Sequence, residues 1–187
     1  HHDMRYATDH YARQVLKLNE TDITFSAAKL FFAYGLGNGL YFPFGAGASS
    51  ILYPGRPRPE SVFDIIHRER PTVFYGVPTL YASMLAVPDA EKTYDLSSLR
   101  LCVSAGEALP AELFNRWRQR FGTEILDGIG STEILHIFIS NRSGAVKPGS
   151  TGIPVPGYEA KLVDEQGTTV SKGEIGNLMI KGDSICS

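Results

Sequence analysis

The sequence contains little cysteine, no long unbroken apolar run and no excess of charge of one sign. Its 2 cysteines, Cys102 inside an apolar run and Cys186 beside the last residue, lie where no disulfide framework would place them. We therefore expect a reducing, cytoplasmic location. The longest apolar stretch, residues 30–44, is broken by 3 glycines and 1 proline and falls short of the roughly 20 residues that a membrane span needs. No transmembrane helix is expected.

The charges are nearly balanced, with 18 basic and 20 acidic residues and a formal net charge of −2. No basic run is present, which argues against a nucleic-acid backbone as the main partner. With 43% apolar residues among 187, the chain has enough material for one hydrophobic core and part of a second. These features favour a soluble globular protein that binds a small ligand, with neither nucleic acid nor a membrane as its partner.

Short apolar runs alternate with glycine or proline and then with amphipathic helical patterns between residues 51 and 133, which is typical of βα units. Such units join parallel strands through right-handed crossovers. The predicted fold class is therefore α/β, with a layered, mostly parallel sheet and flanking helices. The pattern predicts strands at 49–53, 72–75, 99–104 and 124–129, and helices at 59–70, 78–85 and 110–121.

The helix predicted at 110–121 has the clearest periodicity. Leu113, Phe114, Trp117 and Phe121 fall on one face, and Gly122 supplies a left-handed stop. We expect Trp117 in the core, without a role in ligand binding.

The residue composition changes after these units. Residues 142–152 form a polar, glycine-rich loop without a helical period. Alternating residues then predict two antiparallel strands at 158–163 and 176–181. We place a boundary near Lys147, between a partial α/β subdomain at 1–147 and the start of an antiparallel, β-barrel-like subdomain at 148–187.

Three segments are candidates for ligand binding, because ligands of open α/β sheets gather at the carboxyl ends of the strands. In residues 104–110, small side chains let a flat group approach the backbone, although an ordinary tight turn has the same composition. In residues 127–133, two glycines permit close approach, and residues 131–133 predict a helix N-terminus, where a hydroxyl group can donate to a phosphate oxygen. Glu133 beside it either binds a cation such as Mg²⁺ or caps the helix. Residues 30–42 are aromatic and glycine-broken, which suits an apolar pocket or a core segment that turns a corner.

Taken in chain order, these segments resemble a known family. They are similar to the large domain of the adenylate-forming acyl-coenzyme A synthetases, and within that superfamily to the benzoate–coenzyme A ligases. The resemblance covers nearly the whole chain and rests on several collinear motifs. These are AYGLG (33–37), TVFYGVPTLY (72–81), LRLCVSAGEALP (99–110), DGIGSTE (127–133) and GSTGIPVPG (149–157).

The resemblance implies a two-step reaction that uses ATP, Mg²⁺ and coenzyme A. A carboxylate attacks the α-phosphate of Mg-ATP to give an acyl adenylate and pyrophosphate, and the coenzyme A thiol then displaces AMP. By matching position, Thr132 holds phosphate oxygens and Glu133 binds Mg²⁺. Adenine is expected between two walls, one of Gly106, Glu107 and Ala108 and the other of Asp127, Gly128 and Ile129. Many members carry an aromatic residue at the position of Ile129, so aliphatic contact replaces stacking in this chain.

The resemblance also implies which residues line the acyl pocket. Three small residues leave a flat slot and apolar side chains supply its walls, which suits an aryl ring such as that of benzoate. His136 either donates a hydrogen bond to the substrate carboxylate or a ring substituent, or simply caps the pocket. The expected lining is Ala33, Tyr34, Phe42, Ala105, Gly130, His136 and Ile137.

Several alternative substrates and roles remain open at this stage. No aspartate lies between residues 24 and 44 to pair with a substrate ammonium, which disfavours an amino acid. A fatty acid is disfavoured because Tyr34, Phe42 and His136 would crowd a long chain. A 2-aminobenzoate ligase and a non-catalytic nucleotide-binding or aryl-acid-binding module of the same fold are the alternatives. A homodimer is compatible with the resemblance.

Some parts of the family's catalytic machinery have no match in this sequence. The loop that wraps the outer phosphates, the ribose-binding segment, the hinge and the small lysine-bearing C-terminal domain are not found, and Gly182-Asp183 is not assigned to the ribose. The sequence is thus expected to be a central piece of a longer enzyme.

We predict negligible ligase activity and at most weak nucleotide or aryl-acid binding for the 187-residue chain alone, because the principal cationic groups of the transition state are missing. Pyrophosphate release from ATP in the presence of benzoate measures this. Turnover near that of an intact aryl-acid ligase would contradict the prediction.

Overall fold

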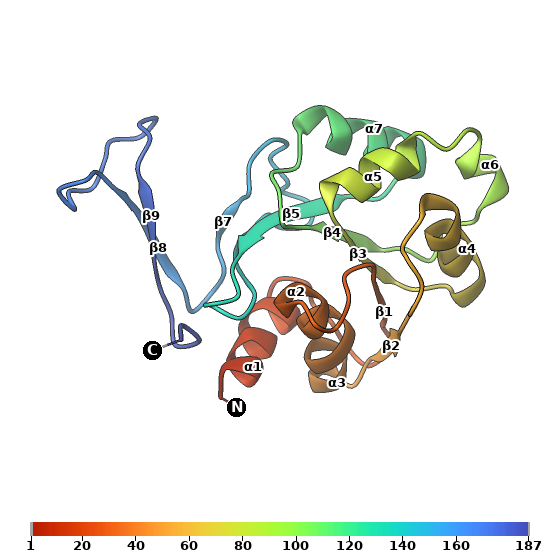
Figure 1. Ribbon diagram of the computed structural model, residues 1–187, viewed down its shortest axis with the longest axis horizontal. Coiled ribbons are helices and arrows are strands. Elements are labelled where there is room, and N and C mark those ends of the chain that lie inside the picture. Colours follow the sequence, from red (N-terminus) through yellow and green to blue (C-terminus); the bar gives the residue numbers. More distant parts are fainter. Residues whose placement is uncertain (1, 187) are drawn as a thin grey trace.

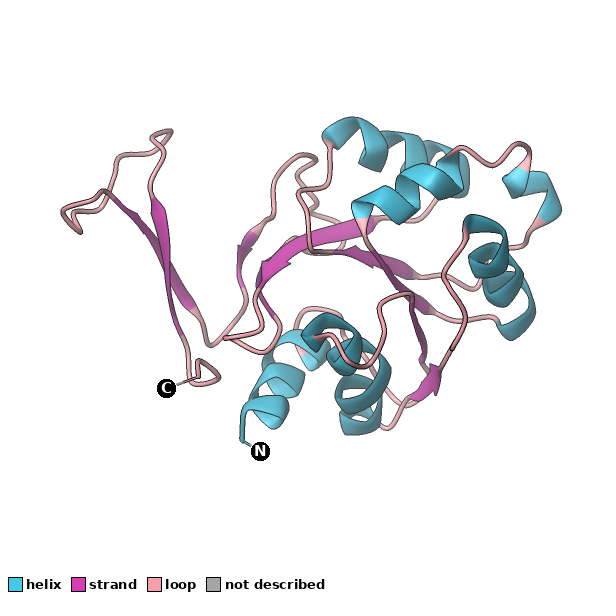
Figure 2. Cartoon of the chain, in the orientation of Figure 1, coloured by secondary structure: helices cyan, strands magenta, loops and turns pink. Residues whose placement is uncertain are grey.

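The computed structural model describes residues 2–186 and shows an α/β sheet with helices on both faces (Figures 1 and 2). Within this range the main sheet has seven strands in the order β2-β1-β3-β4-β5-β6-β7. The strands from β2 to β5 are parallel, and β6 and β7 run antiparallel to their neighbours. The bounds are β1 (Ile23–Ser26), β2 (Ser49–Ile51), β3 (Val73–Gly76), β4 (Leu101–Ser104), β5 (Ile125–Gly130), β6 (Ile137–Ser140) and β7 (Ile153–Pro154).

The helices form one layer on each face of the sheet, as Figure 1 shows. On one face lie α1 (His2–Ala7), the π-helical turn η1 (Thr8–Arg13), α2 (Ala33–Leu36), the π-helical turn η2 (Gly37–Tyr41) and α3 (Phe42–Ala46). On the other face lie α4 (Pro59–Glu69), α5 (Pro78–Leu85), α6 (Ala90–Thr93) and α7 (Ala111–Phe121). No helix in the described part of the chain is long and apolar enough to cross a membrane.

Every residue of the central strands β3 and β4 is buried, because helices cover both of their faces. Successive side chains of a strand point to opposite faces, so each strand contributes to two cores. Tyr75 and Val103 pack with the N-terminal helices, whereas Phe74 and Cys102 pack with α4, α5 and α7. Neighbouring positions in the sequence therefore belong to different cores.

The predicted α/β class and most of the predicted elements are confirmed. The helix predicted at 110–121 is α7, and Trp117 is fully buried with its indole N–H donating to Thr123 Oγ1 at 3.0 Å. The predicted strands 72–75, 99–104 and 124–129 correspond to β3, β4 and β5. The predicted strand at 49–53 is the short edge strand β2, and β1 lies between β2 and β3 without having been predicted.

The prediction that a helix begins at residues 131–133 is wrong. The chain instead makes a turn in which the Leu135 N–H donates to the Thr132 carbonyl at 3.0 Å, and it returns as β6. Leu135 has a φ of 75°, a left-handed conformation that a continuing helix cannot contain. A Cβ at Gly130 would lie 2.6 Å from the His136 carbonyl oxygen, so glycine there allows the two strands of this hairpin to approach closely.

A separate antiparallel pair, β8 (Glu159–Val163) and β9 (Asn177–Lys181), stands apart from the main sheet in Figure 1. This pair confirms the predicted change to antiparallel structure. The expected boundary near Lys147 falls in the glycine-rich loop, and β7, which follows that loop, still pairs with β6.

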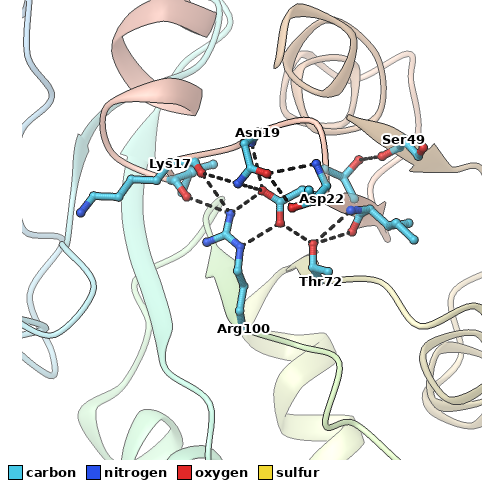
Figure 3. A network of polar contacts seen from close by, with 10 residues as sticks. Lys17, Asn19, Asp22, Ser49, Thr72 and Arg100 are labelled. Atoms are coloured by element: carbon cyan, nitrogen blue, oxygen red, sulfur yellow. Dashed lines mark hydrogen bonds and ion pairs between the residues drawn. The ribbon is translucent and has the colours of Figure 1, made fainter. Parts of the chain in front are cut away.

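The amino ends of the parallel strands are joined through one buried carboxylate, that of Asp22 (Figure 3). The Arg100 guanidinium donates to both carboxylate oxygens at 2.8 Å, and the Thr72 hydroxyl donates at 2.6 Å. Arg100 also donates to the Leu16 carbonyl at 3.1 Å. The segment after η1 is thereby connected to the starts of β3 and β4.

Burial alone would raise the pKa of Asp22, but the hydrogen bonds from Arg100, Thr72 and the Asn19 N–H outweigh it and hold the pKa below its ordinary value of 3.8. The stabilisation by this carboxylate is therefore complete above pH 3.8 and is lost as the pH falls toward the lower folded-state pKa.

We predict that Asp22→Ala lowers the free energy of unfolding by about 2–3 kcal/mol at pH 7, because it leaves Arg100 and Thr72 without their acceptor. The stability of the variant should also fall less steeply than that of the unaltered chain below pH 3.8. Urea unfolding at several pH values measures both effects. Glu159→Ala, in an exposed ion pair with Lys181, is the control and should cost less than about 1 kcal/mol.

Candidate active site

A cavity of about 360 Å³ lies where β3, β4 and β5 end and meet α2 and the turn before β6. This volume is in the range of small-molecule sites. Six of the seven residues predicted for the acyl pocket line it, namely Ala33, Tyr34, Ala105, Gly130, His136 and Ile137. The other lining residues are Ala28, Phe32, Val77, Gly106, Ser131, Thr132 and Leu135. None of the thirteen carries a carboxylate, an ammonium or a guanidinium group, so the wall is apolar apart from hydroxyls, backbone and one imidazole.

Glycine allows the helical wall of this cavity to pack closely. A Cβ at Gly37 would lie 2.5 Å from Cδ2 of His136, and a Cβ at Gly35 would collide with the backbone of Lys29. Gly37 thus lets η2 approach the His136 ring directly, and Gly35 lets α2 pack against the backbone of residues 28–29. The segment 30–42 thus forms a wall of the cavity and also packs in the core. Both interpretations of its composition, an apolar pocket and a core segment, apply to it.

Tyr34 contributes an aromatic wall whose hydroxyl group lies near backbone carbonyls. Its Oη lies 3.2 Å from the Gly76 carbonyl oxygen and 3.4 Å from that of Val103. Burial raises the pKa of Tyr34 well above its ordinary value, so the phenol keeps its proton and donates it. The hydroxyl therefore fixes the ring against the ends of β3 and β4.

His136 is 3% exposed, and its Nε2 lies 3.1 Å from Oδ1 of Asn38 and 3.3 Å from the Tyr34 carbonyl oxygen. Burial lowers the pKa of His136 to about 3, so the ring is neutral. A carbonyl acceptor at Nε2 places the proton there. Nδ1 is then an acceptor and has no partner within residues 2–186. This geometry favours the pocket cap over the donor to a substrate carboxylate.

Phe42, the remaining predicted pocket residue, is not brought to the cavity. It is fully buried, and its ring centroid lies 4.4 Å from that of His136 in an edge-to-face arrangement. Phe42 thus supports the imidazole that lines the cavity and does not itself line it.

The two predicted adenine walls lie at the ends of β4 and β5. Gly106, Glu107 and Ala108 are exposed, as is Ile129, whereas Gly128 is buried. Only Gly106 among these residues also lines the cavity, so the two predicted binding regions meet at that residue.

Asp127, predicted in the second adenine wall, is 3% exposed and has a carboxylate that joins the two strand ends. Oδ2 accepts a hydrogen bond from the Leu109 N–H at 3.2 Å, while Oδ1 has no partner within residues 2–186. Burial raises the pKa of Asp127 to about 6. The unpartnered oxygen is the acceptor that remains for a hydrogen-bond donor at this position.

Thr132 and Glu133 lie in the turn between β5 and β6. Thr132 lines the cavity, and the Glu133 side chain is exposed beside it. No group of three or more histidine, cysteine, aspartate or glutamate residues in the described range can hold a metal ion. A cation at Glu133 would need its other ligands from a bound molecule.

The sequence did not identify Val77 and Leu135 individually as site residues. Val77 follows the β3 strand in a Gly-Val-Pro run, so its position at a strand end was the available signal. The sequence contained no signal for Leu135, because a helix was expected where the structure has the turn that brings this residue to the cavity.

The open, mostly parallel sheet with an apolar cavity at its strand ends places the chain in the α/β class, in which such cavities are the usual position of ligand sites. A family profile described as AMP-binding enzyme matches residues 1–187, and the chain belongs to this family.

The benzoate–CoA ligase of Thauera aromatica is 56% identical over 185 residues, which are 98% of this chain and 35% of that protein. The crystal structure of a benzoate CoA ligase from Burkholderia xenovorans LB400 has a TM-score of 0.94 and 55% identity, covering 99% of this chain and 38% of that one. That of the anthranilate CoA ligase AuaEII with anthranoyl-AMP has a TM-score of 0.95 and 51% identity, over 98% and 36% of the two chains. The resemblance noted in the sequence is confirmed, and the chain spans about a third of the length of these relatives.

We predict that His136 remains neutral with its proton on Nε2 throughout pH 5–8. Because its folded-state pKa of about 3 lies below the ordinary 6.5, its contribution to stability is complete above pH 6.5 and declines as the pH falls toward 3. Nitrogen-15 NMR of the imidazole measures the tautomer. Between pH 6 and 4, His136→Gln should flatten the dependence of unfolding free energy on pH by about 1.4 kcal/mol per pH unit at most. A ring that titrates near pH 6.5 would contradict the prediction.

Proposed function

We propose that this chain forms the acyl-binding site and part of the nucleotide-binding site of an ATP-dependent aryl-acid–coenzyme A ligase, with benzoate as the substrate. The observation that carries the proposal is the apolar cavity at the strand ends, in a chain 56% identical to a benzoate–CoA ligase. Six residues predicted for an aryl pocket lie together in its wall.

The cavity suits an uncharged aromatic ring. Ala33, Ala105 and Gly130 bring only a methyl group or no side chain to its wall, and Tyr34 and Ile137 supply aromatic and aliphatic contact. No charged side chain lines it, so a substrate ammonium placed there would lose its hydration without gaining a partner. The carboxylate of the substrate would lie near Ser131 and Thr132, whose hydroxyl groups are part of the cavity wall.

In the proposed first step, a carboxylate oxygen of the aryl acid attacks the α-phosphorus of ATP and pyrophosphate leaves. In the second, the sulfur of coenzyme A attacks the acyl carbon and AMP leaves. The cavity wall orients the ring and excludes water from the acyl phosphate. The exposed strand ends at Gly106 and Ile129 leave room for adenine, while the unpaired Asp127 oxygen at the end of β5 is itself buried.

The exposed Glu133 carboxylate beside the Thr132 hydroxyl fits a Mg²⁺ site of the kind that takes one or two carboxylates and completes its shell with phosphate oxygens and water. When bound, Mg²⁺ neutralises charge on the phosphates. Thr132 would donate its hydroxyl hydrogen to a phosphate oxygen, while Glu133 would keep the cation at the polar end of the cavity.

A second candidate substrate is 2-aminobenzoate. The specific observation in its favour is the similarity to the anthranilate CoA ligase AuaEII, with a TM-score of 0.95. A panel of aryl acids distinguishes the two substrates. A non-catalytic binding module of the same fold would bind an aryl acid without releasing pyrophosphate.

We predict that Ala33→Val and Ala105→Val, in the full-length gene product that carries this sequence, raise the KM for the aryl acid roughly tenfold or more. The added methyl groups occupy the slot of the ring, whereas the KM for ATP should change less than about twofold. Steady-state kinetics with benzoate and ATP varied in turn give both constants.

Ala82→Val is the matched control, because Ala82 is exposed on α5 and is not part of the cavity wall. Equal increases of both Michaelis constants in the Ala33 and Ala105 variants would contradict the assignment of the aryl pocket. Absence of pyrophosphate release with any aryl acid would contradict the proposed ligase activity.

A further inference from the structure

The turn between β5 and β6, residues 131–136, is held in place by the segment that follows β9. The Ser184 hydroxyl lies 2.9 Å from the Ile134 carbonyl oxygen, and the Cys186 N–H donates to the Glu133 carbonyl at 2.8 Å. Ser184 is 2% exposed and is also 2.7 Å from the Tyr158 hydroxyl. Two consecutive carbonyls of the turn are therefore bound by a segment about fifty residues away in the sequence.

These contacts have a definite direction. The Ile134 carbonyl can only accept, so the Ser184 hydroxyl donates its hydrogen to it. The lone pairs of Ser184 Oγ are then free to accept the hydrogen of the Tyr158 phenol. Burial raises the pKa of Tyr158, which keeps this phenol protonated and able to donate. The result is a chain of two hydrogen bonds from Tyr158 through Ser184 to Ile134, buried at every member.

Tyr158 is itself held by the N-terminal helix. Its ring meets that of Tyr6 edge to face, with centroids 5.5 Å apart, and the Tyr6 hydroxyl donates to the Gly157 carbonyl at 2.5 Å. Tyr158, which directly precedes β8, is therefore held by contacts with α1.

The turn needs such support because its backbone is strained. Leu135 has a φ of 75°, which costs a non-glycine residue roughly 1–2 kcal/mol and persists only where the surroundings determine it. The Leu135 side chain lines the cavity, and Glu133 stands two residues before it. A small relaxation here would move the cavity wall and the exposed carboxylate together.

We propose that Ser184 and Tyr158 are positioning residues that fix the turn 131–136, and thereby the cavity wall at Leu135 and the position of Glu133. The part of this proposal that concerns substrate binding rests on the proposed aryl-acid site. Its effect on the backbone of the turn does not depend on that function.

The test uses Ser184→Ala and Tyr158→Phe in the full-length gene product, with two readouts. The first is amide hydrogen exchange, in which Ser184→Ala should accelerate exchange at Leu135 roughly tenfold, while amides of β4 keep their rates. The second is steady-state kinetics, in which Ser184→Ala should raise the KM for the aryl acid roughly fivefold or more and change kcat less than about twofold. A merely structural role would lower the folded fraction and hence kcat, leaving KM unchanged.

Ser184→Thr keeps the hydroxyl and should restore the KM to within about twofold. Tyr158→Phe should change the KM for the aryl acid and the exchange rate at Leu135 less than Ser184→Ala does. The double variant should resemble Ser184→Ala alone, because both residues act through the same hydrogen-bond chain. Ser171→Ala, at an exposed serine between β8 and β9, is the matched control.

Unchanged exchange at Leu135 together with an unchanged KM in both the Ser184→Ala and Tyr158→Phe variants would overturn the proposal. If Ser184→Ala does not fold, Tyr158→Phe decides by the same two readouts. If the unaltered protein shows no ligase activity, the proposed function fails, and the exchange rates alone decide whether Ser184 and Tyr158 fix the turn.

Discussion

The burial of one carboxylate, that of Asp22, is the constraint on which the arrangement of the parallel strands depends. Removing a carboxylate from water is costly, and here the cost is offset only because Arg100, Thr72 and Asn19 all donate to it. These donors come from the loop before β1 and from the segments that lead into β3 and β4. The amino ends of the strands are thereby fixed relative to one another.

The site at the carboxyl ends of the strands is stabilised by neutral groups. His136 is uncharged, Tyr34 keeps its proton, and the cavity wall contains no ionised side chain. Charge is confined to its margin, where Glu133 is exposed and Asp127 lies under the loop at the end of β4. An apolar wall of this kind favours an uncharged group inside the cavity, because an apolar ring loses little on leaving water whereas a carboxylate would lose much.

Much of the fold followed from periodicity, since β3, β4, β5 and α7 have apolar patterns that few other structures satisfy. The strand β1 (Ile23–Ser26) was not predicted, because its apolar residues alternate with polar ones and are not followed directly by the glycine or proline that marks the ends of β3 and β4. The turn 131–136 was not predicted, because Ser-Thr-Glu is also a common start of a helix and a leucine gives no sequence signal for the left-handed conformation that Leu135 adopts. Six of the thirteen residues that line the cavity were predicted for the pocket through the family resemblance. The packing of Phe42 against the His136 imidazole was not predicted. A phenylalanine that supports the wall and one that lines the cavity have the same signal in the sequence.

The division of β3 and β4 between two cores has a consequence for substitutions in these strands. In β4, Val103 faces the core that adjoins the cavity, while its neighbour Cys102 packs against the helices of the opposite layer. Val103 and Cys102 are both fully buried, so a substitution at either position costs packing energy in its own core. The contacts of the other core are left in place, and a change at Val103 is transmitted toward the cavity while a change at Cys102 is not.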